Sequence, residues 1–150
     1  KDEVAHYVDL MPDGTHRQYT SIQEAKSVIT APSGGQKLLK QGYYDITGLA
    51  WSGRGSVEKV EVSVDGGRNW RPARLEGPIL PKALTRFHCD WVWQGEEALL
   101  QSRVTDSTGY IQPSRAQLVA LRGTRSIYHN NAIQTWRVGD DGEVHNVQLG

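Results

Sequence analysis

Hydrophobic residues in the middle of the chain recur at every second position, which is the period of a β-strand. Val60, Val62 and Val64 alternate with charged and polar residues, so this stretch predicts a half-exposed strand. Residues 84–93 alternate in the same way, with one apolar phase that we expect to face a buried core. That apolar phase contains Phe87, Cys89, Trp91 and Trp93, and the polar phase contains Arg86, His88 and Asp90.

Further strand-like stretches are short, and turn signals separate them at intervals of roughly ten residues. Residues 43–51 are apolar on both faces, which predicts a strand buried on two sides. Pro72 confines the stretch 69–73 to a sheet edge, because proline cannot donate a hydrogen bond to a neighbouring strand. The remaining predicted strands lie at 26–30, 100–104, 117–122, 134–138 and 143–147.

Glycine-containing turns join several of these strands. Asp65-Gly66-Gly67 supplies the positive backbone angles that a tight hairpin turn requires, and residues 139–142 connect the last two strands. No long helical pattern is present. The sequence therefore predicts an all-β protein, and the number and spacing of its strands are typical of an immunoglobulin-like antiparallel β-sandwich.

Residues 1–25 differ from the rest because they are polar and follow no regular period. A turn signal at Pro12-Asp13-Gly14 lies in their middle, and residues 21–24 have the pattern of a capping box for one helical turn. We predict that residues 1–25 form an extended N-terminal arm that lies on a neighbouring part. Residues 26–150 would then form a single sandwich domain. A first residue other than methionine leads us to expect a processed or excised piece.

Charge and cysteine content narrow the class of protein. Seventeen basic and seventeen acidic residues cancel without a run of either sign, which argues against a nucleic-acid partner or a membrane surface. Cys89 is the single cysteine, so an internal disulfide and a zinc site with paired cysteines are excluded. Its place in the apolar phase of 84–93 favours a small buried hydrophobe over a reactive thiol.

The sequence offers no recognisable centre of catalysis or metal binding. No two histidines stand at a spacing that would place them on one face with a carboxylate. Phosphate-binding loops and nucleophile elbows are also lacking. We therefore predict neither a metal site nor catalysis by this chain alone. The histidines in question are His6, His16, His88, His129 and His145.

Two segments are candidate functional sites. Arg54 stands between Gly53 and Gly55, and a forked guanidinium on a tight turn suits an oxyanion. An ordinary solvated hairpin arginine would have the same sequence, and the residues alone leave both interpretations open. Residues 128–136 are rich in aromatic and amide side chains, which suits either contact with a partner or a cover over the sandwich edge.

Several motifs resemble the C-terminal dimerisation domain of the sulfite oxidase family of molybdenum enzymes. The residues that carry this resemblance are Gly48-Leu-Ala-Trp-Ser-Gly-Arg-Gly55 and the stretch from Val60 to Trp70. Within the family the chain is most similar to molybdenum subunits of Sox-type sulfane dehydrogenases, through residues 26–30, 81–87, 109–113 and 128–136. The similarity runs over nearly the whole chain, from about Val8 to Val147.

The resemblance implies an immunoglobulin-like domain that pairs two subunits beside a preceding molybdopterin domain. It implies that Arg54 enters the substrate pocket of that domain, while Cys89 does not match the family's molybdenum ligand. It also implies a molybdenum–molybdopterin cofactor in the parent enzyme, a c-type cytochrome partner and a periplasmic location. The rival hypotheses are a free-standing immunoglobulin-like binding module and a homologue that keeps the dimer without the chemistry.

Overall fold

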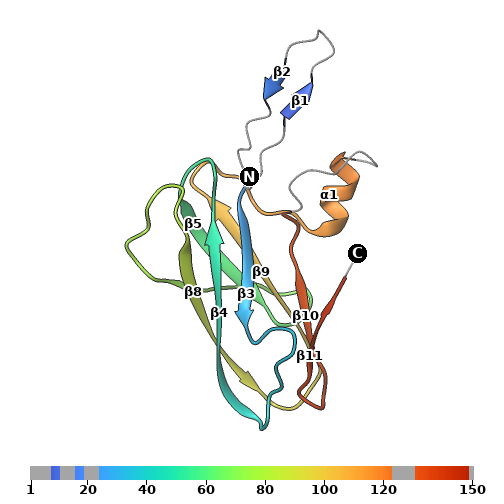
Figure 1. Cartoon of the computed structure of the whole chain (residues 1–150). Helices are drawn as coiled ribbons and strands as arrows, with labels where there is room; N and C mark the ends of the chain where they lie inside the picture. The colour runs from blue at the N-terminus through green and yellow to red at the C-terminus, as the bar shows by residue number, and fades with distance from the viewer. Residues whose placement is uncertain (1–7, 11–15, 19–23, 123–130, 149–150) are drawn as a thin grey trace.

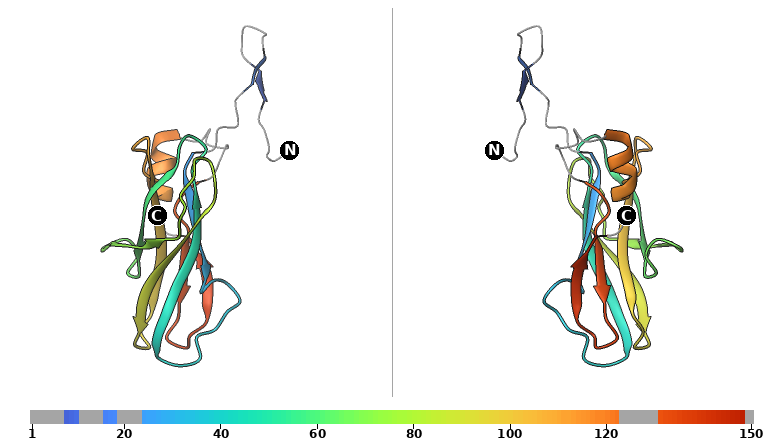
Figure 2. Two further views of the ribbon diagram at one scale, coloured as in Figure 1. Left: turned by 90° about the vertical axis from the view of Figure 1, so that its left-hand side faces the viewer. Right: turned by 90° about the vertical axis from the view of Figure 1, so that its right-hand side faces the viewer.

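A computed structural model describes residues 8–10, 16–18, 24–122 and 131–148. Two antiparallel sheets pack against each other, as Figures 1 and 2 show from three directions. The predicted all-β, immunoglobulin-like sandwich is confirmed. One sheet has the order β3-β4-β8-β7 and the other the order β11-β10-β9-β5-β6. The first comprises β3 (Lys26–Ala31), β4 (Gly42–Trp51), β8 (Thr85–Trp93) and β7 (Arg74–Leu75); the second comprises β11 (Val144–Val147), β10 (Thr135–Val138), β9 (Ala98–Asp106), β5 (Val57–Ser63) and β6 (Arg71–Pro72).

The core lies between the sheets and is built from the alternating positions of the strands. In β8 the apolar phase is buried and the polar phase points outward, as its sequence predicts. Cys89 belongs to this buried phase and is a free thiol, so the prediction of a small buried hydrophobe is confirmed. Burial raises the pKa of the Cys89 thiol, which disfavours the reactive thiolate.

Strand β4 is buried on one face only, so the prediction of two-sided burial is wrong. Ile46, Gly48 and Ala50 point into the core, whereas Tyr43 on the other face is 62% exposed. That second face is the outer surface of the four-stranded sheet. Its apolar residues are half-buried by neighbouring side chains on the same sheet. The strand can therefore carry apolar residues on both faces although no second sheet or helix covers this one.

Residues 115–122 form the helix α1 (Arg115–Arg122), so the predicted strand at 117–122 is wrong. The reason is a reciprocal capping box at the start of the helix. The backbone N–H of Gln117 donates to Ser114 Oγ over 3.0 Å, and the backbone N–H of Ser114 donates to Gln117 Oε1 over 2.9 Å. Apart from Val119, the residues of α1 are arginine, alanine, glutamine and leucine, and all of these favour a helix.

The predicted hairpins and the edge strand are confirmed. Strands β10 and β11 pair antiparallel, and Gly142 in their turn has a φ of 85°. Gly66 and Gly67 have φ values of 76° and 94°, which only glycine adopts readily. Pro72 lies in β6, the edge strand next to β5.

The predicted extended arm contains a short hairpin. β1 (Val8–Leu10) pairs antiparallel with β2 (His16–Gln18) in a separate two-stranded sheet. Residues 21–23 of the suggested capping box lie outside the described residues, and the division into 1–25 and 26–150 stays a prediction. Within the described parts of the chain, no helix has the length and apolar character needed to cross a membrane.

Gly48 provides a test of the packing between β3, β4 and β8. A Cβ atom there would lie 2.2 Å from the Val28 carbonyl oxygen and 2.3 Å from Phe87 Cζ. We expect Gly48→Ala to lower the free energy of unfolding by about 1–3 kcal/mol, because neither backbone nor buried ring can move freely. Chemical denaturation measures this change. Thr47→Ala, on the outward face of the same strand, is the control, and an equal loss in both variants would contradict the packing argument.

Candidate functional site

The turn that carries Arg54 connects β4 to β5 at the end of the sandwich where the chain enters β3 (Figure 1). Ser52 organises this turn from within. Its Oγ accepts the backbone N–H groups of Arg54 and Gly55, each over 3.1 Å. Ser52 is 1% exposed, so the turn folds around a buried hydroxyl.

Asp106 at the end of β9 fixes Ser52 in place. The Ser52 hydroxyl donates to Asp106 Oδ2 over 2.7 Å, and Asp106 is fully buried. Its Oδ1 accepts the N–H and hydroxyl of Thr108 and the N–H of Tyr110, over 2.9, 2.6 and 3.1 Å. One carboxylate therefore joins the β4–β5 turn, which connects the two sheets, to the turn that follows β9.

The pKa of Asp106 is set by two opposing effects. Burial raises the pKa of the carboxyl, but hydrogen bonds from Thr108, Ser52 and Tyr110 lower it, and the net pKa lies below its ordinary value. The charged form is therefore the one that the fold stabilises.

Gly55 allows two backbones to approach closely. A Cβ atom at Gly55 would lie 2.3 Å from Ser107 Oγ, and the Gly55 carbonyl accepts the N–H of Lys82 over 2.9 Å. Gly53 and Gly55 are not among the glycines with positive φ. The flanking glycines that the sequence analysis singled out are therefore explained at Gly55 by close approach, and not by a left-handed conformation.

The Arg54 guanidinium lies at the surface, with its side chain 45% exposed. Its Nη2 is 3.4 Å from Glu24 Oε2, and its Cζ lies 5.7 Å from the centre of the Tyr110 ring. Arg54 thus forms an ion pair and a cation–π contact within this chain while part of it remains accessible. Its role in binding a substrate stays a prediction.

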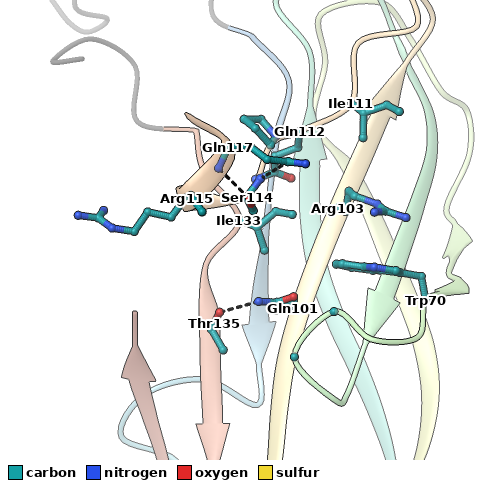
Figure 3. A pocket seen from close by; sticks show the side chains of 14 residues that line it. Trp70, Gln101, Arg103, Ile111, Gln112, Ser114, Arg115, Gln117, Ile133 and Thr135 are labelled. Carbon is teal, nitrogen blue, oxygen red and sulfur yellow. Dashed lines mark hydrogen bonds between the residues drawn. The ribbon is translucent and has the colours of Figure 1, made fainter. Parts of the chain in front are cut away.

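A hollow of about 840 Å³ lies on the outer face of the five-stranded sheet, between α1 and the turn at Gly66 and Gly67 (Figure 3). Arg103 lies within it, with its guanidinium carbon 4.1 Å from the centre of the Trp70 ring. Its Nε and Nη2 donate to Glu61 Oε1 over 3.1 and 2.9 Å. Because Glu61 is directly opposite Arg103 in the β5–β9 register, this ion pair stabilises the pairing of the two strands.

The structure brings together one polar cluster that the sequence did not predict. His88 Nδ1 lies 2.9 Å from Asp45 Oδ2, and His88 Nε2 lies 2.6 Å from Glu76 Oε2. Hydrogen bonds to Glu76 and then Asp45 raise the pKa of His88. Spacing along the chain gave no signal, because strand register makes these residues neighbours. Pairing of β4 with β8 brings Asp45 next to His88, and pairing of β7 with β8 brings in Glu76.

The candidate segment 128–136 is described only from Asn131 onward. Asn131 is buried, and its Nδ2 donates to the Ala25 carbonyl over 3.0 Å. Trp136 Nε1 donates to the Ile29 carbonyl over 3.2 Å. The described half therefore packs along β3 as part of the domain, which supports a covering role for it. Residues 128–130 lie outside the described residues.

The described residues also contain no group of three histidine, cysteine, aspartate or glutamate side chains that could hold a metal ion. His6 and His129 lie outside the described residues, and the prediction about metal binding therefore stays a prediction for the whole chain.

Asp106 gives a pH-dependent prediction. Because its folded pKa is depressed, its stabilising effect is complete above the unfolded pKa of about 3.9 and is lost as pH falls through the folded pKa. We expect Asp106→Asn to lower the free energy of unfolding by about 1–3 kcal/mol at neutral pH. The loss should become smaller as the pH falls through the pKa of Asp106, and denaturation from pH 7 to pH 2 measures it. Asp141→Asn, at an exposed turn carboxylate, is the control. A cost for Asp106→Asn that is independent of pH would contradict the prediction.

Comparisons with known proteins place this geometry in a family. The model of the Mo-co oxidoreductase dimerisation domain matches residues 17–136. The crystal structure of the sulfane dehydrogenase SoxCD from Paracoccus pantotrophus is similar with a TM-score of 0.86 and 55% sequence identity. That similarity covers 96% of this chain and 37% of the solved one.

Curated relatives are longer than this chain. Sulfite oxidase of Gallus gallus is 36% identical over 120 residues, which are 74% of this chain and 26% of the relative. Mitochondrial sulfite oxidase of Mus musculus is 50% identical over 119 residues, covering 71% of this chain and 21% of the relative. A nitrate reductase of Hordeum vulgare is 36% identical over 81 residues, which are 50% of this chain and 9% of the relative. The chain thus spans about a quarter of the sulfite oxidases that it matches, and it belongs to the Mo-co oxidoreductase dimerisation domain family.

Proposed function

We propose that this chain is the dimerisation domain of a molybdenum-dependent oxidoreductase that oxidises a sulfur compound. Its own work is to pair two subunits and to present Arg54 to the substrate pocket of a preceding cofactor domain. The observation that carries this proposal is the 55% identity to a sulfane dehydrogenase over 96% of the chain. The family match over residues 17–136 supports the pairing role.

The molybdenum cofactor would be held outside the part of the chain that the structure describes. Cys89 is buried in the core beside Phe87 and Trp91 and does not suit a metal ligand that must reach a cofactor. The described residues likewise supply no cluster of metal-binding side chains. This domain contributes shape and charge to the enzyme, and the chemistry belongs to the neighbouring domain.

Arg54 has the properties of an oxyanion ligand. Its guanidinium is permanently charged, and its planar N–H groups match two oxygens of a sulfur oxyanion. The turn that carries it is held by buried hydrogen bonds of Ser52, so the cation is presented from a fixed backbone. The turn lies at the end of the sandwich where the chain enters β3, and a preceding domain would adjoin that end (Figure 1).

Sulfur chemistry is the favoured reaction because the matches to the sulfane dehydrogenase and to the chicken and mouse sulfite oxidases cover 96%, 74% and 71% of this chain. The two barley nitrate reductases cover 50% and 59% of it. As parts of the same proposal, a c-type cytochrome subunit accepts the electrons and the enzyme lies in the periplasm. Molybdenum analysis of the full-length protein separates this enzyme from a free-standing binding module or an inactive homologue.

Replacing Arg54 tests its contribution to the pocket. We expect Arg54→Gln in the full-length enzyme to lower kcat/KM for sulfite or the native sulfane substrate by the equivalent of about 2–4 kcal/mol. Folding should be unchanged, since the side chain is 45% exposed. Arg74→Gln is the matched control, because Arg74 is also exposed and ion-paired, at 3.6 Å from Asp90. Unchanged kinetics in Arg54→Gln would remove the arginine from the mechanism.

Molecular mass in solution tests the pairing role. We expect the full-length protein to elute from size exclusion as a dimer by light scattering, because a closed pair with two-fold symmetry buries one self-complementary face. The 150-residue chain alone, of 16.7 kDa, provides the comparison. A full-length protein that stays monomeric at micromolar concentration would contradict the proposed pairing.

A further inference from the structure

A chain of hydrogen bonds leads from the interior of the domain to the Arg54 guanidinium. Asn131 Nδ2 donates to the Tyr110 hydroxyl over 3.0 Å, and that hydroxyl donates to Glu24 Oε1 over 3.1 Å. Glu24 Oε2 then pairs with Arg54 Nη2 at 3.4 Å. The four residues come from segments that are far apart in sequence, so only the folded domain assembles them.

The inner end of this series of hydrogen bonds is buried, and its outer end is accessible to solvent. Asn131 is 3% exposed and also donates to the carbonyl of Ala25, which is fully buried and adjoins Glu24. The Glu24 side chain is 17% exposed, whereas that of Arg54 is 45% exposed. The Tyr110 ring adds a second contact to the guanidinium, 5.7 Å from ring centre to Cζ. Exposure therefore rises from Asn131 through Glu24 to Arg54.

We propose that Tyr110, acting through Glu24, is a positioning residue that holds the Arg54 guanidinium in the direction from which it meets a sulfur oxyanion. This proposal rests on the proposed function of Arg54. A carboxylate beside a bound anion repels it, so Glu24 favours anion binding only by orienting the cation. The ion pair uses one terminal nitrogen of a group with five N–H donors, and within the described residues the other Arg54 side-chain donors have no hydrogen-bond acceptor.

The physical benefit is preorganisation. An arginine side chain has many rotamers, and binding an anion normally requires that most of them be given up. Here the Tyr110 ring restricts the guanidinium on one side and Glu24 restricts one of its nitrogens. Much of the ordering is therefore complete before any ligand arrives, and loss of the Tyr110 hydroxyl should weaken anion binding without removing the charge.

A double-mutant cycle on the full-length holoprotein tests the proposal, with sulfate as the probe and isothermal titration calorimetry as the measurement. Tyr110→Phe keeps the ring and removes the hydrogen bonds of the hydroxyl with Asn131 and Glu24. We expect it to weaken sulfate binding about threefold to tenfold in the wild-type background. In the Arg54→Gln background we expect a change of less than about twofold, because the residue being positioned is gone.

Tyr44→Phe is the matched control, since the Tyr44 hydroxyl also donates a hydrogen bond, to the Lys40 carbonyl over 2.6 Å, at the opposite end of β4 from Arg54. It should leave sulfate affinity unchanged. Asn131→Ala removes the donor to the Tyr110 hydroxyl and is a second variant with the same expected dependence on Arg54. Circular dichroism establishes that each variant is folded.

Each outcome decides a separate point. An equal loss of affinity from Tyr110→Phe in both backgrounds would overturn the positioning role and assign the hydroxyl to general stability. An effect of Arg54→Gln without any effect of Tyr110→Phe or Asn131→Ala would overturn the positioning role alone. If Arg54→Gln itself leaves sulfate affinity unchanged, the proposed function of Arg54 fails and the positioning proposal fails with it.

Discussion

Burial of the Asp106 carboxylate is the constraint on which the candidate site depends. A buried charge is tolerated only when hydrogen bonds replace its hydration, and four donors from Ser52, Thr108 and Tyr110 do so here. The same four bonds determine the path of two turns, one of which carries Arg54. The backbone at the site is therefore shaped by the requirement to solvate an internal anion, and the exposed cation follows from that path.

A second polar group stabilises the packing of the two sheets. Gln112 is 1% exposed, and its Oε1 accepts the N–H of Ser27 and the hydroxyl of Ser27 over 3.2 and 2.7 Å. Its Nε2 donates to the carbonyl of Asn131 over 2.9 Å. The Val104 N–H of β9 also donates to Gln112 Oε1, over 3.3 Å. Apolar packing has no preferred direction, whereas these bonds fix the relative position of β3, β9 and the segment before β10. This second group lies in the same region as the buried carboxylate, and together they make that end of the sandwich well defined.

Local patterns were sufficient to predict most of the fold. The alternation in β8 and the glycine turn at Gly66 follow directly from the period and from backbone angles, because both are properties of adjacent residues. The helix α1 was missed although its signal, Ser114 and Gln117 at capping-box spacing, was present in the sequence. The apolar outer face of β4 was misjudged because the pattern of a strand does not say whether a second layer exists.

Prediction from the sequence was weaker at the candidate site. The Gly53-Arg54-Gly55 turn was located by its composition, but the partners of its arginine come from Glu24 and Tyr110, thirty and more residues away. The His88 cluster depends in the same way on strand register. Tertiary contacts of single polar side chains have no period and no fixed spacing, so a pattern along the chain cannot reveal them.

The contact between Glu24 and Arg54 has a mechanical consequence. Glu24 lies two residues before β3, and the arginine that contacts it at 3.4 Å is 30 positions later in the chain. A body attached through the residues before Glu24 would join this domain at a point next to the guanidinium. Because the attachment point and the guanidinium are so close together, even a wide tilt of that body about this point would move its near edge only slightly relative to the cation. The point of covalent attachment and the positively charged Arg54 guanidinium therefore lie at the same place on the domain.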